Sequence, residues 1–317
     1  MSHRHPLLLN GTELRAIGHR YRSAGAVDGE DGRRRQRNRA EGWLDLVNAP
    51  FESVDETLER LREVEGVFRT ADDRRSVFLT VYTQMTTAVR DGVESGFFDD
   101  PAWVRRYLVA FANEYRTALV RYEREQRQRV PAPWRLAFDS SLGGSTLVLQ
   151  DALLGVNAHI TYDLTYTLEQ IDITRNRRSK LRDHNRINEI LERLVDAVQD
   201  ALVSIYSADT VDDLDSLFGS FDESLAYYGL KEGRRFAWQN AVLLTDYGWP
   251  LLSRYVDWRV RSVSTGAANV ILAPTLDRSR SRQVPVGDAA TSSLEEFQTA
   301  FQQRIPAGDP ATWTRSG

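Results

Sequence analysis

Apolar residues recur every three or four positions along most of this chain, which is the spacing of one face of an α-helix. The pattern begins near Trp43 and continues to about residue 275. Two sequence signals mark helix starts within it. They are the capping box beginning at Ser53 and the Asp100-Pro101 pair, whose proline suits a first helical turn. No useful stretch alternates apolar and polar residues as a strand does. The sequence therefore predicts an all-α, helical-bundle-like single domain of about seven to nine helices over residues 43–275.

The boundaries of the expected helices follow from these periodic segments and from glycine and proline. A helix from 145 to 170 and a helix beginning at Asp183 form the centre of the pattern. The other expected helices begin near Ser53, Asp72 and Asp100, continue with 134–138 and 211–228, and end with 232–245 and 249–272. Gly229 is expected to stop the 211–228 helix.

The two ends of the chain differ in composition from this helical region. Residues 1–42 are rich in arginine and glycine and predict a disordered tail. Residues 276–317 predict a flexible segment with one short amphipathic helix over 293–303, which has Leu294, Phe297 and Phe301 on one face. That helix either docks a partner or another copy of the chain, or packs back on its own domain.

Polar residues stand out on the helix expected over 145–170. His159 and Asp163 are four positions apart, so they share a face beside the apolar stripe. Gly155 lies one turn before His159 and predicts close approach of another helix, because glycine inside a helix is otherwise unfavourable. A histidine and a carboxylate at this spacing can either ligate a divalent metal or hydrogen-bond to each other.

The helix expected after residue 183 carries a similar set. Asp183 predicts the N-cap of that helix, and His184 and Asn188 are again four positions apart. The connection from about 172 to 181 is short, which predicts that the two helices are antiparallel neighbours. On this arrangement, one polar cluster contains both pairs. Its candidate catalytic residues are His159, Asp163, Asp183 and Asn188, its candidate metal ligands are His159 and Asp163, and its candidate pocket residues are Asn157, Tyr162, Tyr166, His184 and Trp238.

Composition narrows the function classes. The net charge of −4 over 317 residues gives no general case for nucleic-acid binding, and the absence of cysteine excludes thiolate chemistry and disulfides. No apolar run is long enough for a membrane span, and the N-terminus lacks a signal-peptide pattern, so we expect a cytoplasmic protein. Neither a phosphate-binding glycine loop nor a nucleophile elbow is present.

Several short motifs resemble one family. They are Phe78-Leu79-Thr80-Val81-Tyr82, Tyr107-Leu108-Val109-Ala110-Phe111, Pro133-Trp134, Gly155 to Ile160 with Asp163-Leu164, Asp183 with Arg186-Ile187-Asn188, and Arg235-Phe236-Ala237-Trp238. From about 47 to 258 the chain resembles the family called domain of unknown function 5995, found in bacteria and haloarchaea. The resemblance implies a helical domain without an established activity. It also implies that Asp183 and Asn188 are more important to the site than His184.

Two functions are consistent with these observations, and the sequence leaves open whether the protein is an enzyme. The first is a structural or ligand-binding helical domain, whose buried polar cluster fixes how the helices pack. The second is a metal-dependent, hydrolase-like enzyme centred on His159 and Asp163, with Asp183 or Asn188 completing the site. A divalent metal is the cofactor that the second function implies, and an unknown small molecule is the ligand that either permits.

Overall fold

The computed structural model describes residues 42–144, 146, 148–206 and 223–281. The expected tail over 1–42 and the expected amphipathic helix over 293–303 therefore fall outside the described residues, apart from residue 42 itself. Every regular element in the described part is a helix, which confirms the predicted all-α class. No described helix is both long enough and apolar enough to cross a membrane.

A short 3-10 helix, η2 (Trp43–Val47), precedes the first α-helices α3 (Val54–Thr70), α4 (Ser76–Glu94) and α5 (Pro101–Glu123). The two predicted helix starts are confirmed. The Ser53 side chain accepts a hydrogen bond from Glu56 N, and the Asp100 side chain accepts one from Trp103 N. A 3-10 turn, η3 (Arg127–Arg129), leads to α6 (Ala132–Gly143), which ends at Gly144 in the left-handed conformation, with φ of 63°.

Three consecutive segments then form one continuous helix, which we call the central helix. They are α7 (Val148–Asn157), the π-helical segment η4 (Ala158–Asp163) and α8 (Leu164–Gln170). Successive parts of the central helix pack against α4, α5, α6 and the two last helices, α11 (Glu223–Tyr247) and α12 (Pro250–Ser281). It is therefore surrounded by other helices, and this explains why its polar residues are buried.

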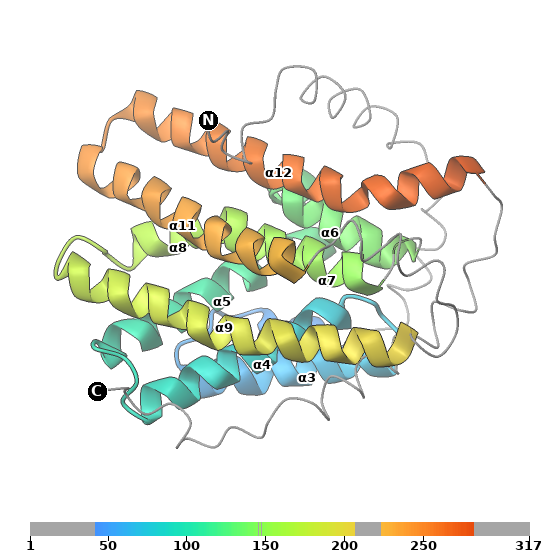
Figure 1. Ribbon diagram of the computed structural model, residues 1–317, viewed down its shortest axis with the longest axis horizontal. Coiled ribbons are helices and arrows are strands. Elements are labelled where there is room, and N and C mark those ends of the chain that lie inside the picture. Colours follow the sequence, from blue (N-terminus) through green and yellow to red (C-terminus); the bar gives the residue numbers. More distant parts are fainter. Residues whose placement is uncertain (1–41, 145, 147, 207–222, 282–317) are drawn as a thin grey trace.

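The remaining helix, α9 (Arg177–Tyr206), packs against α4 and α11, whereas α8 packs against α11 and α5. The central helix and α9, which the sequence predicted to be antiparallel neighbours, therefore have their main contacts with other helices and not with each other. Figure 1 shows the helices lying side by side, with α12 along one edge of the molecule and α3 and α4 toward the opposite edge. The last two helices turn back on each other after Tyr247 and form a hairpin.

The predicted stop at Gly229 is also wrong, because α11 passes through it from Glu223 to Tyr247 without interruption. A Cβ at Gly229 would meet nothing within 4 Å in the described part of the chain, so neither a turn nor close packing there accounts for this glycine. A single glycine costs a helix only about 1 kcal/mol, which tertiary contacts override. Residues 211–222 of the expected 211–228 helix fall outside the described part.

Candidate functional site

His159 and Asp163 are directly bonded to each other inside the protein. His159 Nδ1 lies 2.9 Å from Asp163 Oδ2, and the same carboxylate oxygen accepts a hydrogen bond of 2.8 Å from Trp134 Nε1 on α6. The exposed fractions are 2% for His159 and 1% for Asp163. The two side chains predicted to share a helix face therefore do so, and they engage each other and an indole from another helix.

Aromatic rings enclose the His159 imidazole. It stacks on Phe111 of α5 with ring centroids 3.5 Å apart and planes at 8°. Tyr82 of α4 meets it edge-on at 4.6 Å, and the rings of Phe78, Tyr115 and Trp134 lie within 6.3 Å. This enclosure excludes water and leaves the pair in surroundings of low dielectric constant.

Burial changes the acid–base properties of both partners. It holds the pKa of His159 well below its usual range. Burial, assisted by repulsion from Glu114, holds the pKa of Asp163 well above its usual range, although the Trp134 hydrogen bond acts in the opposite direction. Both shifts favour the uncharged forms of the two side chains. The second imidazole nitrogen, His159 Nε2, has no hydrogen-bond partner among the described residues.

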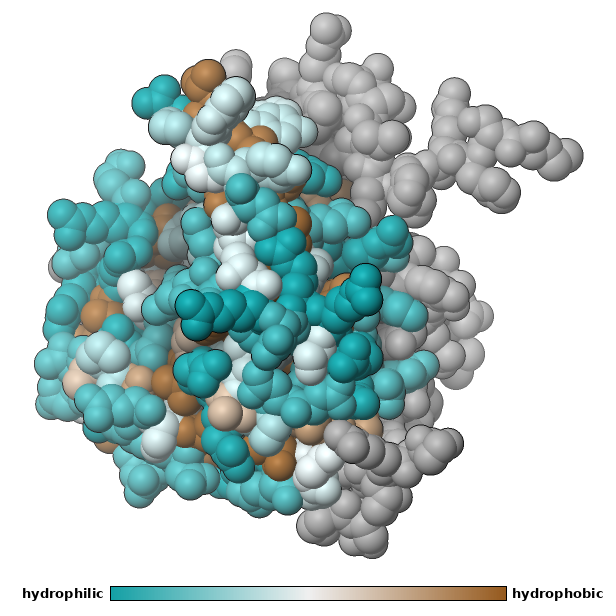
Figure 2. Space-filling view, turned by 90° about the vertical axis from the view of Figure 1, so that its left-hand side faces the viewer, coloured by the Kyte–Doolittle hydropathy of each residue, from teal (hydrophilic) through white to brown (hydrophobic). Residues whose placement is uncertain are grey.

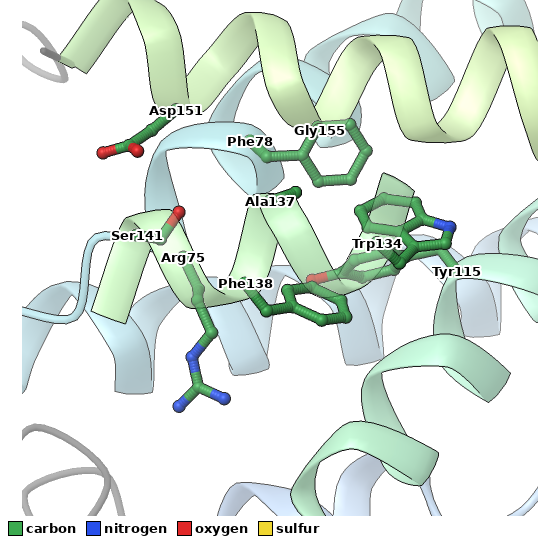
Figure 3. Close-up of a pocket in the computed structure, with 9 residues that line it drawn as sticks. All are labelled: Arg75, Phe78, Tyr115, Trp134, Ala137, Phe138, Ser141, Asp151 and Gly155. Carbon is green, nitrogen blue, oxygen red and sulfur yellow. The ribbon is translucent and has the colours of Figure 1, made fainter. Parts of the chain in front are cut away.

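The backbone that carries this pair is π-helical from Ala158 to Asp163, a feature the sequence did not predict. A π-turn contains an extra residue, which widens the helix and redirects the side chains that follow. Just before it, Gly155 permits close contact with α4. A Cβ at this position would lie 2.4 Å from Cδ2 of Phe78, and Figure 3 shows Phe78 directly beside Gly155. This confirms the predicted reason for a glycine inside the helix.

Asp183 has a different role from the predicted one. Helix α9 begins at Arg177, six positions before Asp183, so Asp183 is not its N-cap. Its carboxylate instead accepts hydrogen bonds from the backbone N–H groups of Asp99 (2.8 Å) and Asp100 (2.7 Å), at the start of α5. The carboxylate thus satisfies free N–H groups at a helix start, as expected, but at the start of another helix.

His184 and Asn188 belong to a second buried cluster, built around Arg234 of α11. Arg234 donates from Nε to Asn188 Oδ1 (2.7 Å) and from Nη2 to the His184 carbonyl (2.7 Å). His184 Nδ1 lies 3.1 Å from Tyr107 Oη and 3.3 Å from Arg234 Nη2, and His184 Nε2 lies 3.3 Å from the Arg234 carbonyl. Because the guanidinium can only donate and a carbonyl can only accept, His184 is a neutral imidazole with its hydrogen on Nε2.

The two histidines are thus held in separate clusters that contact α5 one turn apart along the same face. Tyr107 lies parallel to His184 with centroids 6.1 Å apart, and Phe111, one turn further along α5, stacks on His159. The single cluster expected from the sequence is in fact three: the His159–Asp163–Trp134 network, the Asp183 carboxylate at α5, and the His184–Asn188–Arg234 network.

The other predicted pocket residues do not converge on one cavity. Asn157 donates to the Ser264 carbonyl on α12 (2.8 Å), and Tyr166 donates to Asp257 Oδ1 (2.8 Å). Tyr162 and Tyr166 pack against a small apolar cluster at the α11–α12 hairpin. Trp238 lies against His184, with ring centroids 5.1 Å apart.

A small cavity does lie near the first network, between the central helix, α4, α5 and α6 (Figure 3). It is lined by Arg75, Phe78, Tyr115, Trp134, Ala137, Phe138, Ser141, Asp151 and Gly155. It has room for about one water molecule, far less than a substrate pocket needs. Beside it, a buried ion pair joins Arg74 to Asp151, with Arg74 Nε donating to Asp151 Oδ2 (2.7 Å).

A metal site would need more ligands than the pair provides. Among the described residues, no group of three histidine, aspartate or glutamate side chains is arranged to hold a metal ion. His159 and Asp163 supply two groups that already bond to each other, and Asp183 is engaged at the start of α5. These residues therefore do not fit the metal centre that an H-x-x-x-D pair can suggest.

Sequence reasoning missed three residues that complete these networks: Trp134, Tyr107 and Arg234. Trp134 and Tyr107 stood inside the motifs that carry the family resemblance, so those motifs contained the signal. Arg234 lies outside these motifs, and its position directly before Arg235-Phe236-Ala237-Trp238 is the one feature that could have indicated it.

Comparison with known proteins identifies a family and adds no activity. The model of one family, described as a family of unknown function (DUF5995), matches residues 54–274, which is more than half of the chain. No curated protein and no solved structure matches. The chain belongs to the DUF5995 family, whose matched region contains all three of these polar clusters.

Proposed function

We propose that this protein is a non-catalytic helical scaffold. Its buried polar networks fix the register of the helices, and its outer surface binds a partner. One observation carries the proposal: the two groups best suited to chemistry, His159 and Asp163, bond to each other at 2.9 Å inside a closed aromatic enclosure. Within the part of the chain that the structure describes, neither group is directed at a space where a substrate fits.

Each network joins different helices. Asp163 connects the central helix to α6 through Trp134, Arg234 connects α11 to α9, and Asp183 connects α9 to the start of α5. Apolar packing alone tolerates small slips of one helix along another, whereas hydrogen bonds between buried groups are directional and costly to leave unmade. This supports a register-fixing role for the polar residues, in keeping with what buried polar groups do in some helical assemblies.

The metal-dependent hydrolase has less support. It needs a third ligand beside His159 and Asp163 and a pocket beside them, and the described residues offer neither. The cavity near Trp134 does not offer a small-molecule site either, because it has room for about one water molecule. Binding through the surface requires no such pocket.

Two substitutions at Asp163 test the proposal. Asp163→Ala leaves His159 Nδ1 and Trp134 Nε1 without a hydrogen-bond partner, and we expect it to lower the free energy of unfolding by about 1–3 kcal/mol. Asp163→Asn is the matched control, because it keeps the shape and one acceptor oxygen, and we expect a smaller loss. Urea denaturation followed by circular dichroism measures both. An Asp163→Ala protein as stable as the wild type would contradict the scaffold role.

A further inference from the structure

Large apolar side chains are exposed together where α11 turns into α12. Single exposed apolar residues are common on proteins, but contiguous aromatic groups usually mark a binding surface. Five lie within twelve positions, with these exposed fractions: Tyr247 62%, Trp249 72%, Leu251 73%, Tyr255 50% and Trp258 63%. We call these five residues the hairpin patch. It contains two of the seven tryptophans of the chain.

Helical geometry explains why the patch faces outward. Leu251, Tyr255 and Trp258 are spaced by four and three positions, so they form one stripe along the first turns of α12. The opposite stripe contains Val256 and Val260, both fully buried against α11. An apolar cluster between α11 and α12 therefore stabilises the hairpin without the patch, whose side chains stay exposed and available to a partner.

Arginines accompany the patch. Arg254 and Arg261 border the apolar stripe, each three positions after one of its members, and both are exposed. A third, Arg259, is half-buried. Against these three arginines, residues 250–263 of α12 contain a single carboxylate, Asp257. The first part of α12 is therefore positively charged, although the whole chain has a net charge of −4.

The shape of the hairpin also bears on its partner. Figure 2 shows the left-hand face of Figure 1, where the α11–α12 turn projects at the top as a knob with brown and pale atoms beside some teal ones. Trp249 and Leu251, the most exposed members of the patch, lie in and just after this turn. A convex tip with apolar residues at its end and arginines behind it can enter a soft surface without a matching groove.

We propose that the α11–α12 hairpin docks this protein onto the surface of an anionic lipid bilayer. Tryptophan and tyrosine favour the boundary between lipid headgroups and acyl chains, where an aromatic body and a polar edge are both satisfied. Leu251 adds apolar area beside them. Arg254 and Arg261 face the phosphates, and their long stems let the charged heads reach outward from the helix.

The same side chains could also recognise a protein, since tryptophan, tyrosine and arginine are frequent at protein interfaces. Two features favour the bilayer. Pairing with a second copy about a two-fold axis would bring the arginines of both copies together, which is repulsive. A protein partner would also need a concave acceptor for the knob, whereas a bilayer adapts to its shape.

Vesicle flotation with the full-length protein tests the proposal. We expect binding to vesicles of phosphatidylcholine mixed with phosphatidylglycerol, weaker binding to pure phosphatidylcholine, and loss of binding at high salt. The double variant Trp249→Ser/Leu251→Ser removes the tip, and Arg254→Glu/Arg261→Glu reverses the charge. Each should weaken binding by about tenfold or more. Arg105→Glu/Arg106→Glu, at exposed positions on α5, is the control with the same charge change and should bind as the wild type does.

Circular dichroism melting of each variant checks that these exposed substitutions leave the fold intact. Three results would overturn the proposal: no binding of the wild type to the anionic vesicles, equal binding by the charge-reversed variant, or equal loss in the α5 control. Analytical ultracentrifugation adds a fourth. A dimer that dissociates when Trp249 and Leu251 are replaced would show that a second copy occupies the patch instead of lipid.

Discussion

At the scale of single residues, the buried polar groups of this protein are specified by partners far away in the sequence. The His159–Asp163 bond could be predicted, because positions four apart share a helix face. Trp134 and Arg234 could not be assigned as partners, because they lie 29 positions from Asp163 and 46 from Asn188. Local periodicity has no information about contacts at such separations.

His184 provides a pH test of this residue-level description. Burial and the neighbouring Arg234 hold its pKa well below the usual value of about 6.5, because protonated Nδ1 would meet the donors of that guanidinium. Below about pH 6.5 the unfolded chain takes up a proton at His184 and the folded protein does not. Stability from this group is therefore complete above that pH and falls as the pH decreases, by up to about 1.4 kcal/mol per pH unit.

The variant His184→Gln isolates this contribution. It removes the titrating group and leaves His159 and Asp163 in both proteins, so their contributions cancel in the comparison. We expect the unfolding free energy of the wild type to fall more steeply from about pH 6.5 to about pH 5 than that of the variant. Urea denaturation at several pH values measures both slopes, and parallel curves would contradict the assigned neutral imidazole.

At the scale of elements, helix type was predictable from the sequence and several helix ends were not. Helix α9 begins at Arg177 and not at Asp183, because the carbonyl of Asn176 already accepts bonds from Ser179 N and Lys180 N. Asp183 was thereby available to satisfy the start of α5. The π-helical segment at Ala158–Asp163 has no recognised sequence signal, so the sequence did not predict it.

Glycine positions test how tightly the elements pack. Gly155→Ala would place a methyl group 2.4 Å from the Phe78 ring, so we expect lower stability despite the better helix propensity of alanine. Gly66 of α3 is the matched control, because a Cβ there would meet nothing within 4 Å in the described structure. We expect Gly66→Ala to raise stability by about 0.4–1 kcal/mol. Thermal unfolding of both variants measures the two changes in melting temperature. A stabilising Gly155→Ala would refute the close contact between the central helix and α4.

At the scale of the whole molecule, the all-α class followed from apolar spacing, whereas the arrangement of the helices did not. A short connection between the central helix and α9 predicted direct packing, yet α8 and α9 each pack against α11 and have different second neighbours, α5 and α4. Placing the central helix among five others buries both of its faces. For that reason His159 and Asp163 are enclosed by aromatic rings and do not line a cleft between two helices.

A scaffold of this kind requires that His159 and Asp163 bond to each other and not to a metal. The most direct test is thermal unfolding of untagged, full-length protein in the presence of a chelator and in excess zinc. A metal bound only by the folded state at a hundredfold excess over its dissociation constant would add about 2.7 kcal/mol, which raises the melting temperature measurably. We expect equal melting temperatures in the two conditions. A zinc-dependent rise in the wild type that is absent from Asp163→Asn would show instead that the pair binds a metal.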